Sequence, residues 1–221
     1  ATLKASEWFG IGRATLLTLM RTSAAVVIGT IWTVPAGIYI GMHPRAARLL
    51  QPVVQVAASF PAPMLFPLAL MLLDRLHVGL GLGSVLLMVL GTQWYILFNV
   101  IAAAASIPHD LIETAQVYRF GKWQRWRVLL LPGVFPGLVT GWVTAAGGAW
   151  NASIVSEYVH FSGEVRTTDG LGALISLSAE QGHFPQLAAA VAAMVFLVVF
   201  INRNFWRRLY DLAQRQYTVG S

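Results

Sequence analysis

The 221-residue sequence contains no cysteine and very little charge. Without cysteine it can form neither a disulfide framework nor a thiolate metal site. Only 11% of the residues are charged and 57% are hydrophobic, whereas soluble domains contain roughly 25% charged residues. These values predict an all-α, polytopic membrane protein. Its length suits one domain, residues 1–221, with about five spanning helices of about 20 residues each.

Motifs for enzymatic chemistry are also missing from the sequence. There is no GxxxxGK[ST] phosphate loop, because Gly121 and Lys122 are followed by Trp123. No HExxH pattern occurs, and the five histidines are scattered over different turns and loops. The glycine-rich stretch 79–84 has neither a strand before it nor an acidic residue about 20 positions later, as a dinucleotide site requires. We therefore expect no catalytic residue, no metal and no cofactor.

The apolar runs have no ionisable residue near their middle, although ion-coupled carriers usually do. The runs cover residues 23–42, 49–73, 78–107, 128–156 and 184–202. This absence argues against a self-powered carrier and favours a helical pathway driven by a partner. The net charge of +6 comes from Lys and Arg scattered between the runs, which is typical of membrane anchoring and orientation and not of nucleic-acid binding.

Several runs have features that predict their shape. The second run contains Pro61, Pro63 and Pro67, so we expect a kinked or broken helix, which either is structural or lines a path. The fourth run repeats glycine every four residues, at 133, 137 and 141, which predicts a face for close helix packing. Between the last two runs, residues 157–186 are polar and glycine-rich, with one short amphipathic helix around Leu171 to Leu177.

The two ends of the chain mix basic and apolar residues. Residues 1–22 are expected to form a surface helix or a loop, and residues 203–221 an interfacial helix. With five spans, ten Lys and Arg fall on the side of the tail and of residues 107–132, and five fall on the other side, which together account for all 15. Because basic residues are enriched in cytoplasmic loops, this bias places residues 107–132 in the cytoplasm.

Residues 107–132 form the one long charged and aromatic interruption of the apolar sequence. Pro108 suits the first turn of a helix, and Leu111, Ile112, Ala115 and Tyr118 are spaced to share one face of it. Gly121 then allows a turn, and an interfacial return containing Trp123, Trp126, Leu129 and Leu130 ends at Pro132. Either a partner protein binds this segment, or it is a surface loop anchored to lipid headgroups.

This stretch resembles the EAA loop of the integral membrane permeases of binding-protein-dependent ABC importers. Glu113, Thr114 and Ala115 fall on the Glu-Ala-Ala triplet, and Leu131 and Pro132 fall on the terminal Leu-Pro pair. Two departures stand out: Thr114 replaces the middle alanine, and Arg119 stands where the family usually has its glycine, with Gly121 two residues later. The resemblance covers most of the chain, from residues 18–22 to the tail.

The resemblance implies a non-catalytic, multi-pass permease subunit in a bacterial plasma (inner) membrane. A cytoplasmic ABC ATPase would bind the first helix of the loop in a groove, an extracytoplasmic substrate-binding protein would deliver the substrate, and a second permease unit would complete the path. The residues expected to couple the chain to the ATPase are Leu111, Glu113, Thr114, Ala115, Tyr118, Arg119, Gly121, Leu131 and Pro132.

The stretches WQRWRVLLLP, at 123–132, and AGGAWNASIVSEY, at 146–158, are most similar to the nitrate, sulfonate and bicarbonate branch of this family. Some members fuse two units in one chain, which the start at Ala1 would fit. Polar groups in or near the spans that either line an anion path or bond between helices are Gln93, Asn99, Asn151 and Ser153. The competing functions are a self-contained secondary transporter or channel, and a scaffold without flux.

Overall fold

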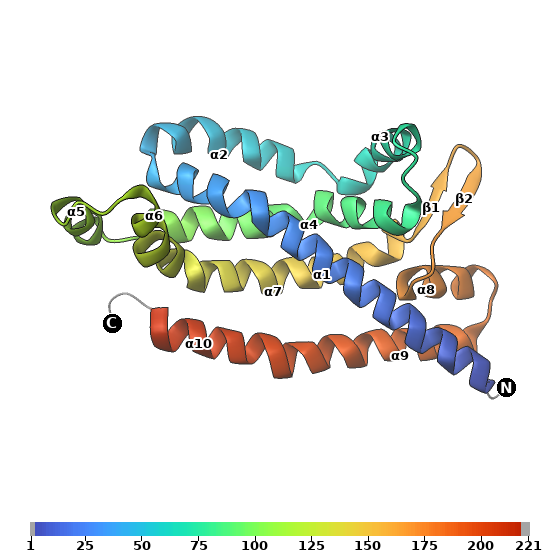
Figure 1. Cartoon of the computed structure of the whole chain (residues 1–221). Coiled ribbons are helices and arrows are strands. Elements are labelled where there is room, and N and C mark those ends of the chain that lie inside the picture. Colours follow the sequence, from blue (N-terminus) through green and yellow to red (C-terminus); the bar gives the residue numbers. More distant parts are fainter. Residues whose placement is uncertain (1–2, 218–221) are drawn as a thin grey trace. The chain divides into compact units, whose positions relative to one another are not determined.

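The computed structural model describes residues 3–217, most of which are helical (Figure 1). The helices are α1 (Ala5–Met42), α2 (Pro44–Ser59), α3 (Ala62–Arg75), α4 (Leu80–Ala105), α5 (His109–Val117), α6 (Lys122–Arg125), η1 (Trp126–Leu130), α7 (Leu131–Ser156), α8 (Leu171–Glu180), α9 (Phe184–Ile201), η2 (Asn202–Trp206) and α10 (Arg207–Tyr217), where η marks a π-helical turn. A hairpin of two short strands, β1 (Tyr158–Phe161) and β2 (Glu164–Thr167), joins α7 to α8. The predicted all-α bundle is confirmed, and the hairpin is an element that the sequence patterns did not predict.

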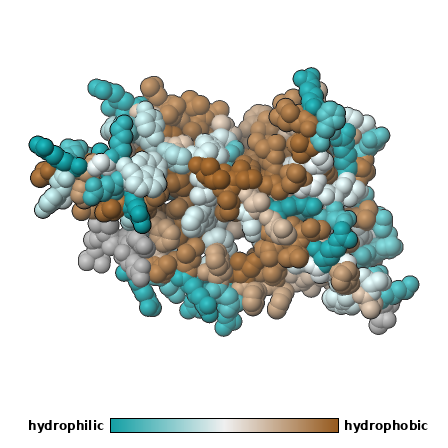
Figure 2. All heavy atoms as spheres, viewed as in Figure 1, coloured by the Kyte–Doolittle hydropathy of each residue, from teal (hydrophilic) through white to brown (hydrophobic). Residues whose placement is uncertain are grey.

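Four helical stretches within residues 3–217 are long and apolar enough to cross a membrane. They are α1, α4, the continuous stretch Lys122–Ser156 and the continuous stretch Phe184–Arg215. Helices α2 and α3 pass the same test only as a pair, which brings the number of candidate spans to five. Figure 2 shows brown, hydrophobic residues over the long helices and teal, hydrophilic residues over the α5–α6 segment and the hairpin. The predicted number of about five spans agrees with this count.

Helix α1 differs from the sequence prediction because it runs for 38 residues without a break. A separate surface segment ending at residue 22 was expected, since Arg13 and Arg21 interrupt the apolar pattern. Both guanidinium groups instead have acidic partners in the fold, Asp169 for Arg13 and Glu157 for Arg21. Charge that is neutralised within the protein does not force the chain out of a helix.

The predicted break in the second run lies at Phe60 and Pro61, between α2 and α3. Pro61 is the N-cap of α3, with φ −61° and ψ 117°. A proline disfavours the helical conformation of the residue before it, which ends α2 at Ser59. The expected kinked or broken helix is therefore confirmed, and Pro61 is its cause.

The chain folds into two compact units, and α1, α4 and α7 contribute to both. The first unit contains residues 1–28, 60–92 and 146–201. Three apolar clusters among the described residues contribute to its core, each joining different elements. They are Ile11, Leu171 and Ala190 from α1, α8 and α9, then Phe66, Leu73, Leu87 and Val159 from α3, α4 and β1, and Ala25, Val85 and Met88 from α1 and α4.

The second unit contains residues 29–59, 93–145 and 202–221, and glycines set its helix spacing. The predicted glycine face of α7 is confirmed: Gly133 packs on Ile107, Gly137 on Ala103 and Gly141 on Ile96. A Cβ at Gly137 would come within 2.9 Å of the Asn99 carbonyl oxygen, so α7 and α4 touch through their backbones. Helix α2 joins this unit through Ala47 and Val54, which pack on Ile40, Leu97 and Ile101.

The tail continues as helix beyond the last apolar run. After η2, α10 runs from Arg207 to Tyr217 and carries basic residues beside Leu209 and Leu212. The last four residues of the predicted interfacial tail, 218–221, lie outside the described residues. Its placement at a membrane surface stays a prediction.

Candidate functional site

Helix α5 is the first half of the segment between α4 and α7, and Figure 1 shows α5 and α6 beyond the ends of those two helices. It starts after Pro108, whose carbonyl accepts the Leu111 N–H at 3.2 Å. Ala115 is buried and Leu111 and Ile112 are half-buried, as the predicted face requires. Glu113 and Thr114 are exposed. The helix is thus attached along one face and free along the other.

Tyr118 departs from the predicted inward face of α5. It is the C-cap residue, and 72% of it is exposed. The periodicity extrapolates one turn too far, because the helix ends at Val117. Val117 is 78% exposed and Trp123 is 76% exposed, so these three side chains place apolar surface on the tip of the segment.

The turn after α5 is a Schellman motif centred on Arg119. The Phe120 N–H donates to the Ala115 carbonyl and the Arg119 N–H donates to the Gln116 carbonyl, both at 2.9 Å. This arrangement requires a left-handed residue at the first position after the cap, and Arg119 has φ 53°. The position where the related family usually has glycine is therefore the one that glycine would suit best.

Gly121 does not make the turn that the sequence predicted for it. Its φ of −62° and ψ of 160° are extended values that any residue adopts. A Cβ at this position would meet no atom within 4 Å. The prediction was wrong here because a glycine indicates freedom to turn, whereas the hydrogen bonds that end α5 place the turn two residues earlier.

The return from the turn is helical from Lys122 onward, whereas the sequence predicted a separate interfacial segment. Five residues of it, Trp126–Leu130, form a π-helical turn immediately before Leu131 and Pro132. Pro132 has no N–H to donate to the carbonyl four residues earlier, at Val128. A widened turn is a common way to accommodate such a defect. The Leu-Pro pair thus marks where the loop joins α7.

A pocket of about 750 Å³ lies between α5 and the helices to which it is attached. Leu111, Thr114 and Ala115 line it from α5, and Pro132 lines it from the start of α7. Asn99 of α4 lines the same pocket, and its side-chain amide donates to the Tyr95 carbonyl at 2.8 Å. The structure therefore brings four of the predicted coupling residues and one predicted path residue together. Predicted coupling residues outside the lining of this pocket are Glu113, Tyr118, Arg119, Gly121 and Leu131.

The other three predicted path residues are not among the residues that line this pocket. The side-chain amide oxygen of Gln93 accepts a hydrogen bond from the Trp32 indole at 3.1 Å. Asn151 is exposed on α7, and Ser153 is buried and donates to the Trp150 carbonyl at 2.7 Å. Gln93 belongs to the second unit, whereas Asn151 and Ser153 belong to the first. A role for these residues in a path stays a prediction.

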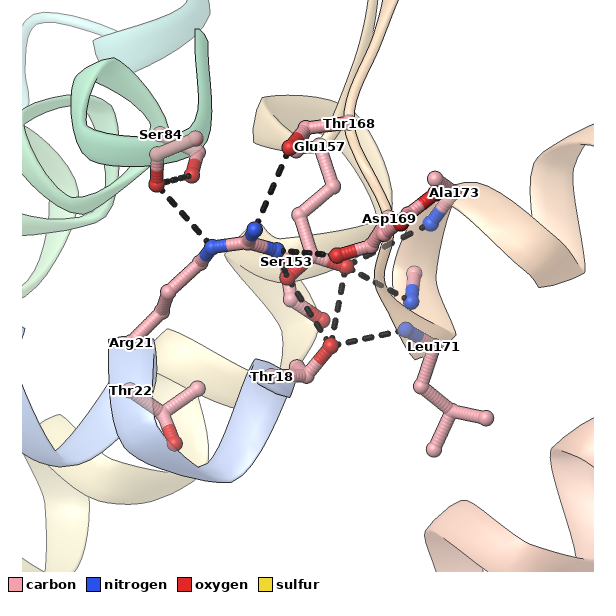
Figure 3. Close-up of polar contacts among 12 residues, drawn as sticks. Thr18, Arg21, Thr22, Ser84, Ser153, Glu157, Thr168, Asp169, Leu171 and Ala173 are labelled. Carbon is pink, nitrogen blue, oxygen red and sulfur yellow. Dashed lines mark hydrogen bonds and ion pairs between the residues drawn. The ribbon is translucent and has the colours of Figure 1, made fainter. Parts of the chain in front are cut away.

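The first unit holds a buried carboxylate that the sequence did not place (Figure 3). Glu157 has a fully buried side chain, and Arg21 donates to it at 2.9 Å. The Thr18 hydroxyl donates to the two carboxylate oxygens at 2.8 and 3.0 Å. The backbone N–H groups of Gly172 and Ala173 donate at 2.9 and 3.4 Å. The carboxylate therefore caps the start of α8, where a negative charge also suits the helix dipole.

Arg21 is held by further contacts around the same carboxylate. Its guanidinium donates to the carbonyls of Gly81 and Asp169 and to the Thr168 hydroxyl, at 3.0, 2.7 and 3.1 Å. These bonds join α1 to the start of α4 and to the segment between β2 and α8. In the sequence, Arg21 and Glu157 are only charges at the ends of apolar runs. The sequence does not indicate that these two residues, 136 positions apart, form a pair.

Two glycines allow α8 to approach Glu157 and α7 closely. A Cβ at Gly170 would overlap the Glu157 carboxylate, and one at Gly172 would overlap the Ser153 carbonyl. The Leu171 N–H between them donates to the Thr18 hydroxyl at 2.7 Å. The sequence Gly-Leu-Gly at 170–172 is thus required by contact distance and not by an unusual backbone conformation.

The hairpin is tied to its surroundings by polar groups outside the apolar runs. The Tyr158 hydroxyl donates to Glu180 at the end of α8, and His160 lies 3.3 Å from the same carboxylate. These two contacts, the Tyr158 bond first, lower the pKa of Glu180, and the same bond raises the pKa of Tyr158. On the other strand, Arg166 pairs with Asp74 in the last turn of α3 at 2.6 Å.

Long apolar helices with a polar helix between two of them define the class as a polytopic helical membrane protein. Residues 33–212 match the family model described as the binding-protein-dependent transport system inner membrane component. This is most of the chain, and the protein belongs to that family. Membership agrees with the resemblance that residues 107–132 carry and with a multi-pass location in the membrane.

Curated relatives include permease proteins of several import systems. The chain is 27% identical to the bicarbonate transport system permease protein CmpB of Synechocystis sp., over 88% of this chain and 66% of the relative. It is 34% identical to the riboflavin transport system permease protein RibX of Chloroflexus aurantiacus, over 73% and 58%. It is 24% identical to the nitrate import permease protein NrtB of Synechococcus elongatus, over 71% and 54%. The chain thus spans between about half and two thirds of these relatives' lengths.

Solved structures show that the fold is shared more widely than the sequence. An inward-facing structure of the MetNI methionine ABC transporter contains a chain that superposes with a TM-score of 0.76. The match covers 96% of this chain and all of that one at 19% identity. At this identity the likeness shows the fold alone.

Proposed function

We propose that this chain is the permease subunit of an ATP-driven importer and forms the path for a small anion such as nitrate, a sulfonate or bicarbonate. The observation that carries the proposal is α5, a short helix attached along one face and exposed along the other, at the position of the EAA loop. ATP hydrolysis is assigned to a partner subunit, because the sequence has no phosphate loop. The chain itself is non-catalytic.

The exposed side of the α5 segment has the chemistry of a helix that binds in a groove. Asp110 and Glu113 supply negative charge, and Val117, Tyr118 and Trp123 supply exposed apolar surface. Buried aromatic anchors surrounded by charge are typical of protein interfaces. This combination supports a cytoplasmic ATPase subunit as the partner, bound by helix-in-groove recognition.

Membership of the family and the fold support two further partners. A binding-protein-dependent system uses a substrate-binding protein, which would meet the side of the chain that holds the hairpin. A second permease unit, either a copy or a sibling, would complete the path. The named relatives import different solutes, so the choice of a small anion rests on the sequence similarity of residues 123–132 and 146–158 and on the uncharged polar groups in the spans.

The test of this function is the charge reversal Glu113→Arg. A reversed charge at a docking surface meets like charge on the partner, so ATP hydrolysis and uptake are expected to fall about tenfold or more. Both are measured in proteoliposomes that hold the chain with its co-purified ATPase subunit. A glycine inserted after Glu113 is expected to have the same effect, because it rotates the two faces of α5 relative to each other.

Asp211→Arg is the matched control, because it reverses the charge of another exposed carboxylate, on α10. It is expected to leave ATP hydrolysis unchanged. Coupled uptake that survives Glu113→Arg would contradict the role of α5. Uptake that proceeds with no ATPase subunit in the liposomes would instead establish the alternative, a self-contained carrier or channel.

A further inference from the structure

Helix α2 separates its side chains into three faces, and one of them is polar. No residue of this helix is buried. At 100° per residue, Ala47 and Val54 fall on the face that packs on α1 and α4. Leu49, Val53 and Val56, which are 62% to 73% exposed, fall on the outer face. The third face carries Arg48, Gln51, Gln55 and Ser59 and borders the packing face.

Three of the four residues of this polar face, all except Arg48, line a groove of about 510 Å³ between α2 and α4. Gln51, Gln55 and Ser59 form one wall, and Phe98, Ile101 and Ala102 of α4 form the other. All of these residues belong to the second unit. The groove therefore has one wall of evenly spaced hydrogen-bonding groups and one apolar wall.

The amides of Gln51 and Gln55 are left without protein partners. Among residues 3–217, neither side chain makes a hydrogen bond, and Arg48 makes no ion pair. The helix belongs to the α2–α3 pair that together has the length and apolarity of a span. Unpaired amides are costly in hydrocarbon, so the polar face must meet water or a polar solute while the outer face meets lipid.

We propose that the Arg48–Gln51–Gln55–Ser59 face of α2 lines the route of the anion through this chain. The glutamine amides each present two N–H donors, which suit the oxygens of an oxyanion without holding it as tightly as a fixed charge would. Arg48 stands at the end of the face that the charge bias places in the cytoplasm, where it attracts the anion toward the exit. The inference rests on the proposed permease function and names path residues outside the four that the sequence indicated.

The absence of cysteine from the sequence allows a direct test. Single cysteines replace Gln51, Gln55 or Ser59 in the full chain, with Val53→Cys and Val56→Cys as controls on the same helix. Each variant is treated in membranes with an anionic, sulfonate-bearing methanethiosulfonate reagent. Because the thiolate is the reactive form and apolar surroundings suppress it, the three polar-face cysteines are expected to react at least about tenfold faster than the two controls. Equal rates on both faces, or faster reaction of the controls, would overturn the proposal.

A second arm tests whether the route favours anions. Arg48 lies one helical turn from position 51, so replacing it with glutamine removes an attraction between neighbouring side chains. In the Gln51→Cys background, Arg48→Gln is expected to slow the anionic reagent roughly threefold and to leave a neutral methanethiosulfonate unaffected. Equal effects on both reagents would show that the route does not favour anions.

The outcome is independent of the test of ATP coupling. Glu113→Arg alters α5 and leaves α2 unchanged, so it is expected to abolish ATPase stimulation without changing the labelling pattern. Labelling confined to the polar face, together with uptake that proceeds with no ATPase subunit, would support the route and refute the ATP-driven function. The opposite pair of results would refute the route alone.

Discussion

Arg21 and Glu157 show how two charges are accommodated in a chain that has few. Each carboxylate oxygen has at least two donors, and the guanidinium is bonded to three further oxygens. A buried ion pair is retained only if nearly every lone pair and proton is used in this way. Together the two residues join α1, α4, α7 and the start of α8.

Removing one partner of this pair is expected to be severely destabilising. Arg21→Ala leaves an uncompensated carboxylate in a buried site, which typically costs about 3 to 5 kcal/mol. The midpoint of thermal unfolding of the purified protein in detergent should fall accordingly. Arg13→Ala is the matched control, because the Arg13–Asp169 pair is 66% and 72% exposed and exposed pairs contribute little. A midpoint shift for Arg21→Ala no larger than that for Arg13→Ala would contradict the role given to the buried pair.

At the scale of the element, the turn after α5 distinguishes Arg119 from Gly121, where the sequence predicts the turn. Arg119 has the left-handed conformation and Gly121 has an extended one. An arginine in the left-handed region is strained by roughly 1 kcal/mol relative to glycine. The departure from the family pattern therefore weakens the end of α5, where the proposed partner would bind.

Single substitutions at Arg119 and at Gly121 should reveal this strain. Arg119→Gly is expected to stabilise the end of α5 by about 1 kcal/mol, which corresponds to roughly fivefold slower hydrogen exchange of the Phe120 amide. Hydrogen–deuterium exchange with mass spectrometry on peptides covering 109–122 measures it. Gly121→Ala should be neutral or slightly stabilising, because its φ and ψ suit alanine and no atom lies near the added methyl group. Loss of protection in Gly121→Ala would mean that Gly121 carries the turn after all.

At the scale of the whole molecule, the charge bias sets the orientation. Of the five basic residues on the proposed outer side, Arg21 is neutralised by Glu157 inside the fold. Acidic partners contribute little to this bias, so the count of ten against five is unchanged. The α5–α6 segment is expected in the cytoplasm and the hairpin outside, because basic loops are retained on the cytoplasmic side.

Two single cysteines can check this orientation. Gln124→Cys lies on α6 and Glu164→Cys on β2, and both positions are exposed. A membrane-impermeant thiol reagent added to intact cells is expected to label Glu164→Cys only. Gln124→Cys should react after permeabilisation. The reverse pattern would invert the topology and would remove α5 from the reach of a cytoplasmic ATPase.

The sequence by itself determined the class of the protein, the approximate spans, the glycine face of α7 and the inward face of α5. Hydropathy, helical periodicity and a contiguous motif are local properties, and a membrane leaves few alternatives for an apolar run. The Pro61 break follows in the same way, from steric rules between neighbouring residues. These predictions are confirmed in the structure, except that Tyr118, expected on the inward face of α5, is exposed.

Only the tertiary structure decided which distant groups meet. The Arg21–Glu157 contact joins residues 136 positions apart, and Gly172 is explained only by its contact with α7. The polar face of α2 borders a groove only because α4 supplies the opposite wall. Even the turn at Arg119 depends on the hydrogen bonds that end α5. Such features depend on pairings across the fold, and a linear pattern does not encode which segments come together.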